Sequence, residues 1–205
     1  MTYETRLDSA RDADPTREAW LVRLAHRPPA EIVKKLTAGD PLQLRELAAR
    51  RLRERALFVD TDRLFAGTAV EIAHAVAARG PSRDRTSAPR DAVDWLLARV
   101  DAAIDGALCE DREEDRLGIA PRGEAIHPVP FLPAVEPGRA RRAALEFNAL
   151  PDAARKAFFA LLIEGQSIEA CLARGLGPSD VLRERVRWGL RALQSPSARE
   201  DECAA

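Results

Sequence analysis

The sequence has few aromatic residues, few cysteines and no run in which β-branched residues alternate with polar ones. Phe, Trp and Tyr together make up 5% of the 205 residues. The three cysteines, Cys109, Cys171 and Cys203, lie far apart without a CxxC spacing, so neither a disulfide framework nor a zinc site is expected. Strands are not expected either. Ala, Leu and Arg dominate instead, and because all three favour helices we expect an all-α protein.

A long apolar run and a strong net charge are also missing. No segment approaches the roughly 18 apolar residues of a membrane span, and the polar first residues do not form a signal peptide, so we expect a cytoplasmic protein without a membrane partner. The formal net charge of −1 gives no general attraction to nucleic acid, so any DNA site has to be local. The sequence pairs no nucleophile with a base and holds no phosphate-binding loop. We therefore expect no enzyme activity, no cofactor and no metal.

Helical spacing of apolar residues predicts a block of helices in the first half of the chain. Their approximate ranges are 15–27, 29–38, 41–59, 61–78 and 91–110. The next segment, 117–138, holds five prolines and three glycines, a density that no regular element tolerates.

This Pro/Gly-rich segment predicts a division of the chain. We interpret 116–138 as a linker between an N-terminal helical domain, 14–115, and a C-terminal domain, 139–195. A long surface loop within one domain is the alternative. After the linker, further helices are expected at about 139–148 and 151–163, followed by a last pair.

The last pair of helices is predicted to be separated by a glycine turn. Ser167 is placed to cap the first helix, Gly175 and Gly177 to form the turn, and Pro178 with Ser179 to begin the second helix. The inner side of the first helix is expected to carry Ile168, Cys171 and Leu172. Helical spacing in the second predicts a buried seam of Leu182, Val186, Gly189 and Leu193.

The opposite face of the second helix is strongly charged. It carries Asp180, Arg183, Glu184, Arg187 and Arg191. Arginine suits a DNA-facing surface because its planar fork binds phosphate and the guanine edge bidentately. A short helix, a glycine turn and a longer helix with an arginine-rich outer face predict a DNA-binding helix-turn-helix. The same pattern also fits an ordinary helical hairpin with a solvated charged face.

Residues 150–193 resemble region 4 of the extracytoplasmic-function sigma factors. That region typically reads LP, a charged amphipathic helix, EG-x-S-x-E, and a recognition helix ending R-A-L. Leu150-Pro151, Glu164-Gly165, Ser167, Glu169 and Arg191-Ala192-Leu193 match this pattern without gaps. In the amphipathic helix the expected core residues are Phe158, Phe159, Leu161 and Leu162.

The resemblance implies a sigma-like transcription factor that recognises promoter DNA. RNA polymerase core would be its protein partner, and an anti-sigma-like regulator is a further candidate. Arg183 and Arg185 stand where the family carries basic DNA contacts, and Arg187 lies close by. We expect these three side chains on or beside the outward side, away from the buried seam, where substitution changes stability by less than about 0.5 kcal/mol. The full set expected at the DNA is Ser179, Asp180, Arg183, Glu184, Arg185, Arg187 and Arg191.

Residues 40–110 resemble region 2 of the same family in fewer positions. The hexapeptide 62–67 takes the place of the polymerase-binding helix, with Ala66-Gly67 where the family has Gln-Glu. Trp95-Leu96 and Ile104-Asp105 match the following helix with one residue fewer between them, and five acidic residues within 110–115 replace a basic run.

An acidic Asp180 beside the expected phosphates lowers the expected DNA affinity. The pair Ala66-Gly67 and the acidic run at 110–115 support an alternative of another class. In that alternative the chain is a degenerate sigma-like protein–protein interaction module that binds neither promoter nor polymerase. A third interpretation, an isolated DNA-binding repressor, requires a dimer surface that the sequence does not identify.

Overall fold

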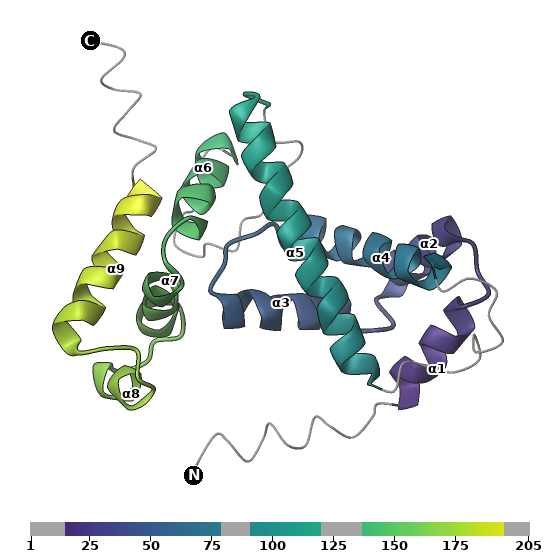
Figure 1. Ribbon diagram of the computed structural model, residues 1–205, viewed down its shortest axis with the longest axis horizontal. Helices are drawn as coiled ribbons and strands as arrows, with labels where there is room; N and C mark the ends of the chain where they lie inside the picture. Colours follow the sequence, from purple (N-terminus) through teal and green to yellow (C-terminus); the bar gives the residue numbers. More distant parts are fainter. Residues whose placement is uncertain (1–14, 79–90, 120–136, 195–205) are drawn as a thin grey trace. The chain divides into compact units, whose positions relative to one another are not determined.

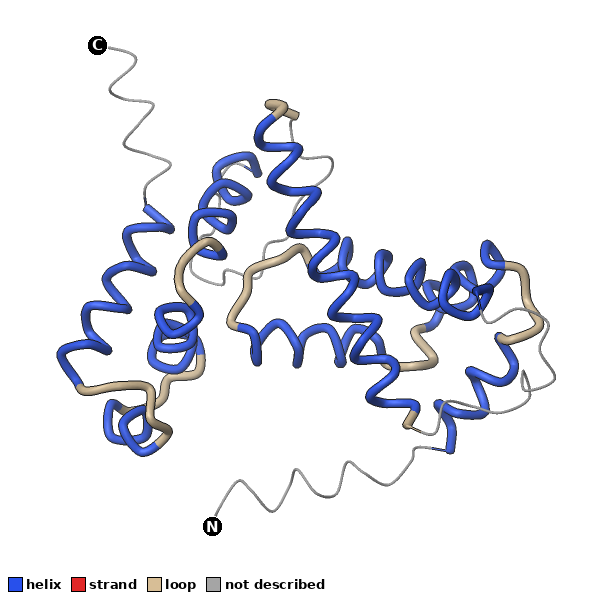
Figure 2. The backbone as a smooth tube through the Cα atoms, in the orientation of Figure 1, coloured by secondary structure: helices blue, strands red, loops and turns tan. Residues whose placement is uncertain are grey.

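The computed structural model describes residues 15–78, 91–119 and 137–194. Every regular element in these ranges is helical (Figures 1 and 2), so the expected all-α class is confirmed. The elements are α1 (Pro15–Leu24), α2 (Pro29–Gly39), α3 (Leu44–Arg55), α4 (Thr61–Ala78), α5 (Ala92–Arg116), α6 (Pro137–Asn148), α7 (Asp152–Phe158), the π-helical turn η3 (Phe159–Ile163), α8 (Ile168–Ala173) and α9 (Ser179–Gln194). None of these helices combines the length and the apolar character that crossing a membrane needs.

Helix α3 is shorter than the expected range of 41–59, and its ends show why. The carboxylate of Asp40 accepts hydrogen bonds from the backbone N–H groups of Leu44, at 2.6 Å, and Arg45, at 3.0 Å. An acidic side chain that satisfies the first free N–H groups of a helix fixes its start. At the other end Ala56 has φ +50°, a left-handed conformation that stops the helix.

Helix α5 is longer than the expected range of 91–110, because the charged stretch that follows residue 110 is helical too. Glu and Arg are good helix formers, and within the last turn Arg116 pairs with Glu113 at 2.6 Å. Glu114 pairs with Arg141 of α6 at 3.0 Å, and Asp115 with Arg142 at 3.8 Å.

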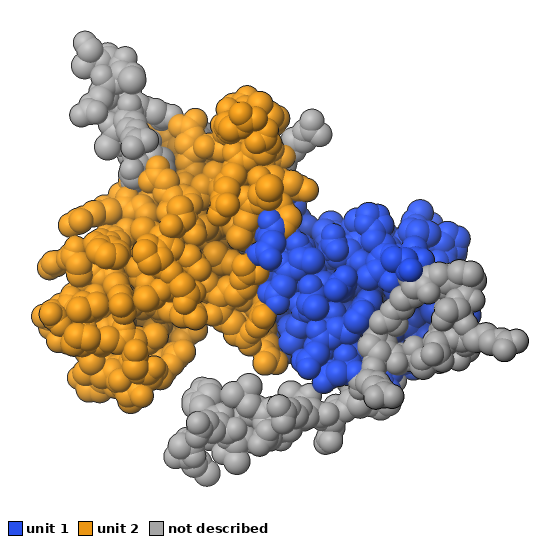
Figure 3. Space-filling view, in the orientation of Figure 1, with its two compact units in different colours: residues 1–48, 62–105 blue, residues 49–61, 106–205 orange. Residues whose placement is uncertain are grey.

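The chain divides into two compact units, shown in Figure 3. Unit 1 comprises residues 1–48 and 62–105, and unit 2 comprises 49–61 and 106–205. Unit 2 is therefore larger than the expected domain 139–195, because the end of α3 and the end of α5 group with the C-terminal helices. Residues 120–136, most of the expected linker, lie outside the described part of the chain.

Unit 1 has an apolar core built by one face of each of its helices. Ile32 and Leu36 of α2, Ile72 of α4 and Leu96 of α5 are fully buried. At the edge of this core the guanidinium of Arg45 lies 4.2 Å from the ring centre of Phe65.

The core of unit 2 is a cluster of four phenylalanines. The ring centres of Phe58 and Phe147 are 4.6 Å apart, and those of Phe147 and Phe158 are 5.0 Å apart. Phe159 completes the cluster at 5.0 Å from Phe58. Tilted aromatic contacts at these distances are favourable beyond the area they bury.

The helix that begins at Asp152 changes to a π-helical turn at Phe159. A π turn rotates each residue by less than an α turn does, so the residues after Phe159 leave the expected face. Leu162, expected in the core, is 39% exposed, and Leu161 is only half-buried. The prediction of four core residues is therefore wrong for Leu162.

Candidate nucleic-acid interface

Helix α8 begins as the sequence predicts and packs through Cys171, with the half-buried Ile168 against the same cluster. The Ser167 hydroxyl accepts a hydrogen bond from the backbone N–H of Ala170 at 3.2 Å. Cys171 is fully buried, and this burial raises the pKa of its thiol. Leu172 is 45% exposed, so its expected place on the inner side is wrong.

The turn between α8 and α9 depends on two glycines. Gly175 has φ +73° and Gly177 has φ +112°, and these are backbone conformations that side chains other than glycine rarely adopt. Between them, the carbonyl oxygen of Leu176 accepts a hydrogen bond from the guanidinium of Arg185. A side chain at Gly177 would place its Cβ 3.1 Å from Nη1 of the same arginine.

This hydrogen bond corrects the prediction for Arg185. The sequence places its side chain on or beside the outward side, available to DNA like those of Arg183 and Arg187. It is instead half-buried and folded back onto the turn. Arg185 therefore joins α9 to the turn, and its charge is less available to a ligand than the charges of the two exposed arginines.

The buried side of α9 follows the predicted seam. Leu182 is fully buried, Gly189 is buried, and Val186 and Leu193 pack at the edge of the phenylalanine cluster. At Gly189 the helix approaches α7 so closely that an added Cβ would lie 2.3 Å from Cδ2 of Phe158. The seam fixes the rotation of α9 about its own axis, and thereby decides which residues face away from the unit.

Three arginines occupy the outward face of α9. Arg183, Arg187 and Arg191 are all exposed and follow one another every four residues, a spacing that places them along one side of a helix. Arg187 lies 3.4 Å from the carboxylate of Glu184. Across the described ranges, Arg183 and Arg191 form no ion pair. An exposed pair such as Arg187–Glu184 contributes little and yields easily to a competing anion.

The other expected DNA residues on α9 differ in availability. Asp180 is exposed in the first turn, and Ser179, where the helix begins, is half-buried. Glu184 is half-buried and accepts a hydrogen bond from Nε1 of Trp188 at 3.0 Å. Its negative charge is thus held between Arg187 and Trp188, whereas that of Asp180 is open to solvent.

Two features of this region are not apparent in the sequence pattern. Trp188 is 41% exposed and Leu190 is 40% exposed, although a tryptophan in an amphipathic helix is more often packed. The acidic residues at the end of α5 contact α6 through Glu114 and Asp115. In the sequence, the signal for this contact between α5 and α6 is the pair Arg141-Arg142, whose positive charge complements the acidic stretch.

In unit 1, the segment that resembles a polymerase-binding helix forms the first turns of α4. Leu64 and Phe65 are buried, whereas Ala66 is exposed. The exposed position therefore offers a methyl group where the family pattern has a polar side chain.

No family model, curated protein or solved structure matches the chain.

Proposed function

We propose that the chain binds duplex DNA through the outward face of α9 and acts as a sigma-factor-like protein of transcription initiation. The observation that carries this proposal is the row of exposed arginines Arg183, Arg187 and Arg191. They lie on the second helix of a helix-turn-helix whose opposite side is anchored in the unit.

The dimensions of this row suit the major groove. Eight residues separate Arg183 from Arg191, which is about 12 Å along a helix axis. The major groove of B-DNA, about 12 Å wide, admits an α-helix, and a helix lying along it holds exposed arginines at this axial spacing near successive phosphates. Arg183, in the N-terminal half of α9, is the best placed to reach a base edge, because that half of a recognition helix enters the groove.

Asp180 opposes binding at the same end of the helix. An exposed carboxylate near the phosphates repels them, and Asp180, unlike Glu184 beside Arg187, forms no ion pair in the described part of the chain. The three arginines outnumber it on the outward face. We therefore infer moderate, strongly salt-dependent affinity for DNA rather than tight binding.

The protein partner in this proposal is RNA polymerase core, and the location is the cytoplasm. The polymerase partner rests on the resemblance of residues 40–110 to region 2 of the sigma factors, and the location follows from the proposed role in transcription initiation. Because Ala66-Gly67 replaces the polar pair of that pattern, we infer weaker binding to polymerase than that of an ordinary sigma factor. A competition assay with core enzyme and a second sigma factor measures it, and tight, saturable competition would contradict this inference.

One observation favours the alternative of a protein–protein interaction module. Trp188 and Leu190 expose apolar surface on the same helix as the arginines, and tryptophan with arginine is typical of protein interfaces. In this alternative α9 contacts a protein and has no affinity for DNA.

The experiment that separates the two is fluorescence anisotropy with the full chain and a labelled duplex of about 20 base pairs at low salt, where phosphate contacts are strongest. The variant R183A/R187A/R191A should lose most of the binding. The matched control R27A/R112A/R116A removes three exposed arginines elsewhere and should keep it. Absence of DNA binding by the unmodified chain would contradict the proposal and leave only the alternative of a protein–protein interaction module.

A further inference from the structure

Two surface pockets of unit 2 adjoin each other beside the start of the helix-turn-helix. One has a volume of about 230 Å³ and the other about 210 Å³. Both are lined by Arg53 and Phe159, so these two residues form the boundary between them. Neither pocket belongs to the outward face of α9.

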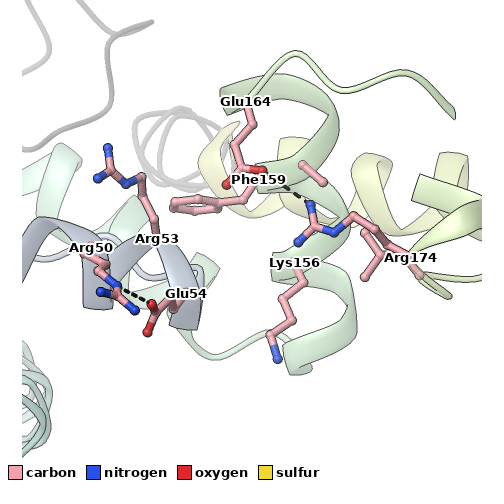
Figure 4. A pocket seen from close by; sticks show the side chains of 9 residues that line it. Arg50, Arg53, Glu54, Lys156, Phe159, Glu164 and Arg174 are labelled. Atoms are coloured by element: carbon pink, nitrogen blue, oxygen red, sulfur yellow. Dashed lines mark hydrogen bonds and ion pairs between the residues drawn. The ribbon is translucent and has the colours of Figure 1, made fainter. Parts of the chain in front are cut away.

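The first pocket is basic. Arg50, Arg53, Lys156 and Arg174 line it, together with the carboxylates of Glu54 and Glu164. Figure 4 shows Arg50 paired with Glu54 on one side and Arg174 with Glu164 on the other. We call this space the basic pocket.

The two carboxylates in the basic pocket are already paired with arginines. Glu54 accepts from Nε of Arg50 at 2.8 Å and from Nη1 of Arg51 at 2.9 Å. Burial alone would raise the pKa of Glu54, but the hydrogen bonds and charges of Arg50 and Arg51 outweigh it and lower the pKa. Glu164 accepts from Nε2 of Gln166 at 2.7 Å and lies 3.6 Å from Arg174.

Lys156 is paired too, with Asp152 at 2.8 Å. Arg53 differs from the other cations of the pocket, because it forms no ion pair within the ranges that the structure describes. Its exposed guanidinium is therefore available to an anion, and its planar fork suits a sulfonate, phosphate or carboxylate group.

The second pocket is apolar. Apart from Arg53 and Thr61, its lining consists of Ala49, Leu52, Leu57, Phe58, Phe159 and Ile163. Three of these lining residues are positioned by the fold. The backbone of Phe58 is hydrogen-bonded to Asn148, and Phe159 and Ile163 belong to the π turn η3. Single π turns inside α-helices occur frequently at functional sites. We call this space the apolar pocket.

We propose that the two pockets together bind a small molecule that carries one anionic group on an apolar or aromatic body. The anionic group contacts Arg53 in the basic pocket, and the body enters the apolar pocket past the ring of Phe159. A site with an apolar lining and a few placed polar groups is the usual form of a small-molecule site. This proposal does not depend on DNA binding.

The test uses two fluorescent probes that differ only in charge, with the full chain and no DNA. 8-Anilinonaphthalene-1-sulfonate has one anionic group on an aromatic body, and N-phenyl-1-naphthylamine is the same molecule without the sulfonate. We expect saturable binding of the sulfonate with one site per chain. Its affinity should exceed that of the uncharged probe by about threefold or more, the effect of one exposed charge pair.

Variants of Arg53 assign the site. R53A should lower the affinity for the sulfonate probe to that for the uncharged probe, and it should leave the affinity for the uncharged probe unchanged. R53K should restore much of the difference in affinity. R112A removes an exposed arginine outside both pockets and should change neither probe. Circular dichroism verifies that each variant is folded. Equal affinities of the two probes, no binding, or binding of the sulfonate that R53A leaves unchanged would each overturn the proposal.

Discussion

The side-chain amide of Asn148 and the backbone of Phe58 exchange two hydrogen bonds. The N–H of Phe58 donates to Oδ1 of Asn148 at 2.9 Å, and Nδ2 of Asn148 donates to the carbonyl of Phe58 at 2.7 Å. Both bonds are buried, and they join positions 90 residues apart. An asparagine side chain offers an acceptor oxygen and two N–H donors, so this one side chain satisfies both the backbone N–H and the backbone carbonyl of Phe58.

Replacing Asn148 with Ala should destabilise unit 2. The change leaves a buried N–H and a buried carbonyl at Phe58 without partners, which costs about 2–4 kcal/mol in total. Urea unfolding followed by circular dichroism measures it. The control is Gln194→Ala at the exposed end of α9, which should change stability by less than about 0.5 kcal/mol. Equal effects of the two changes would show that the pair with Phe58 contributes nothing.

Two glycine-to-alanine changes should shift the free energy of unfolding in opposite directions. At Gly189 an added Cβ would lie 2.3 Å from the ring of Phe158, whereas at Gly106 in α5 it would meet nothing within 4 Å. We expect Gly189→Ala to cost about 1–3 kcal/mol through overpacking, and Gly106→Ala to stabilise by up to about 1 kcal/mol through helix propensity. Thermal unfolding distinguishes them, and stabilisation by Gly189→Ala would contradict the close packing of α9 on α7.

Arg185 and Arg183 are two residues apart on one helix, and they should respond differently to substitution. Arg185→Ala removes the hydrogen bond to the carbonyl of Leu176 and should destabilise the unit by about 1 kcal/mol. Arg183→Ala should have no effect beyond about 0.5 kcal/mol. Chemical unfolding gives both values, and hydrogen exchange should show faster opening of the turn in the first variant only. The same stability in both would mean that Arg185 does not hold the turn.

Cys171 should be unreactive in the folded protein, and its reactivity should depend on pH. Burial raises the pKa of its thiol, so at pH 8 the reactive thiolate is scarce. In the variant C109S/C203S, which leaves only this thiol, we expect slow reaction with Ellman's reagent in buffer and fast reaction in urea. Fast reaction in buffer would contradict the burial of α8 against α9.

The same thiol makes stability fall at alkaline pH. Because its pKa is higher in the folded state, the thiol ionises more readily in the unfolded chain. The free energy of unfolding therefore keeps its full value below the unfolded pKa of about 8.5 and falls as the pH rises above it. Cys171→Ala in the C109S/C203S background should remove this part of the pH dependence, which urea unfolding between neutral and alkaline pH measures.

The sequence predicts what is local and periodic. The all-α class, the Ser167 cap, the glycine turn and the buried seam of α9 all follow from spacing within one or two helical turns, and the structure has each of them. Spacing alone could not give the direction of Arg185, because that side chain follows the carbonyl of Leu176, whose position depends on the fold of the turn.

Long-range partners account for the remaining differences. Helix α5 continues past the predicted end, and its last turns meet Arg141 and Arg142 of α6. The bond between Asn148 and Phe58 joins segments that no periodicity relates. The π turn at Phe159 moved Leu162 out of the core. Whether the arginines of α9 contact DNA stays a prediction, because charge and exposure define an available surface without naming its ligand.

The most direct test of the account is a salt titration of the affinity of the full chain for mixed-sequence duplex DNA. Each phosphate contact adds about 0.9 to the slope of log K against log salt. If Arg183, Arg187 and Arg191 each contact a phosphate, every single Ala substitution should weaken binding and reduce the slope by about one, and the triple variant by about three. Asp180→Asn should strengthen binding because it removes a repulsive charge. Slopes that are the same in the unmodified chain and the triple variant would contradict the proposal that α9 binds DNA.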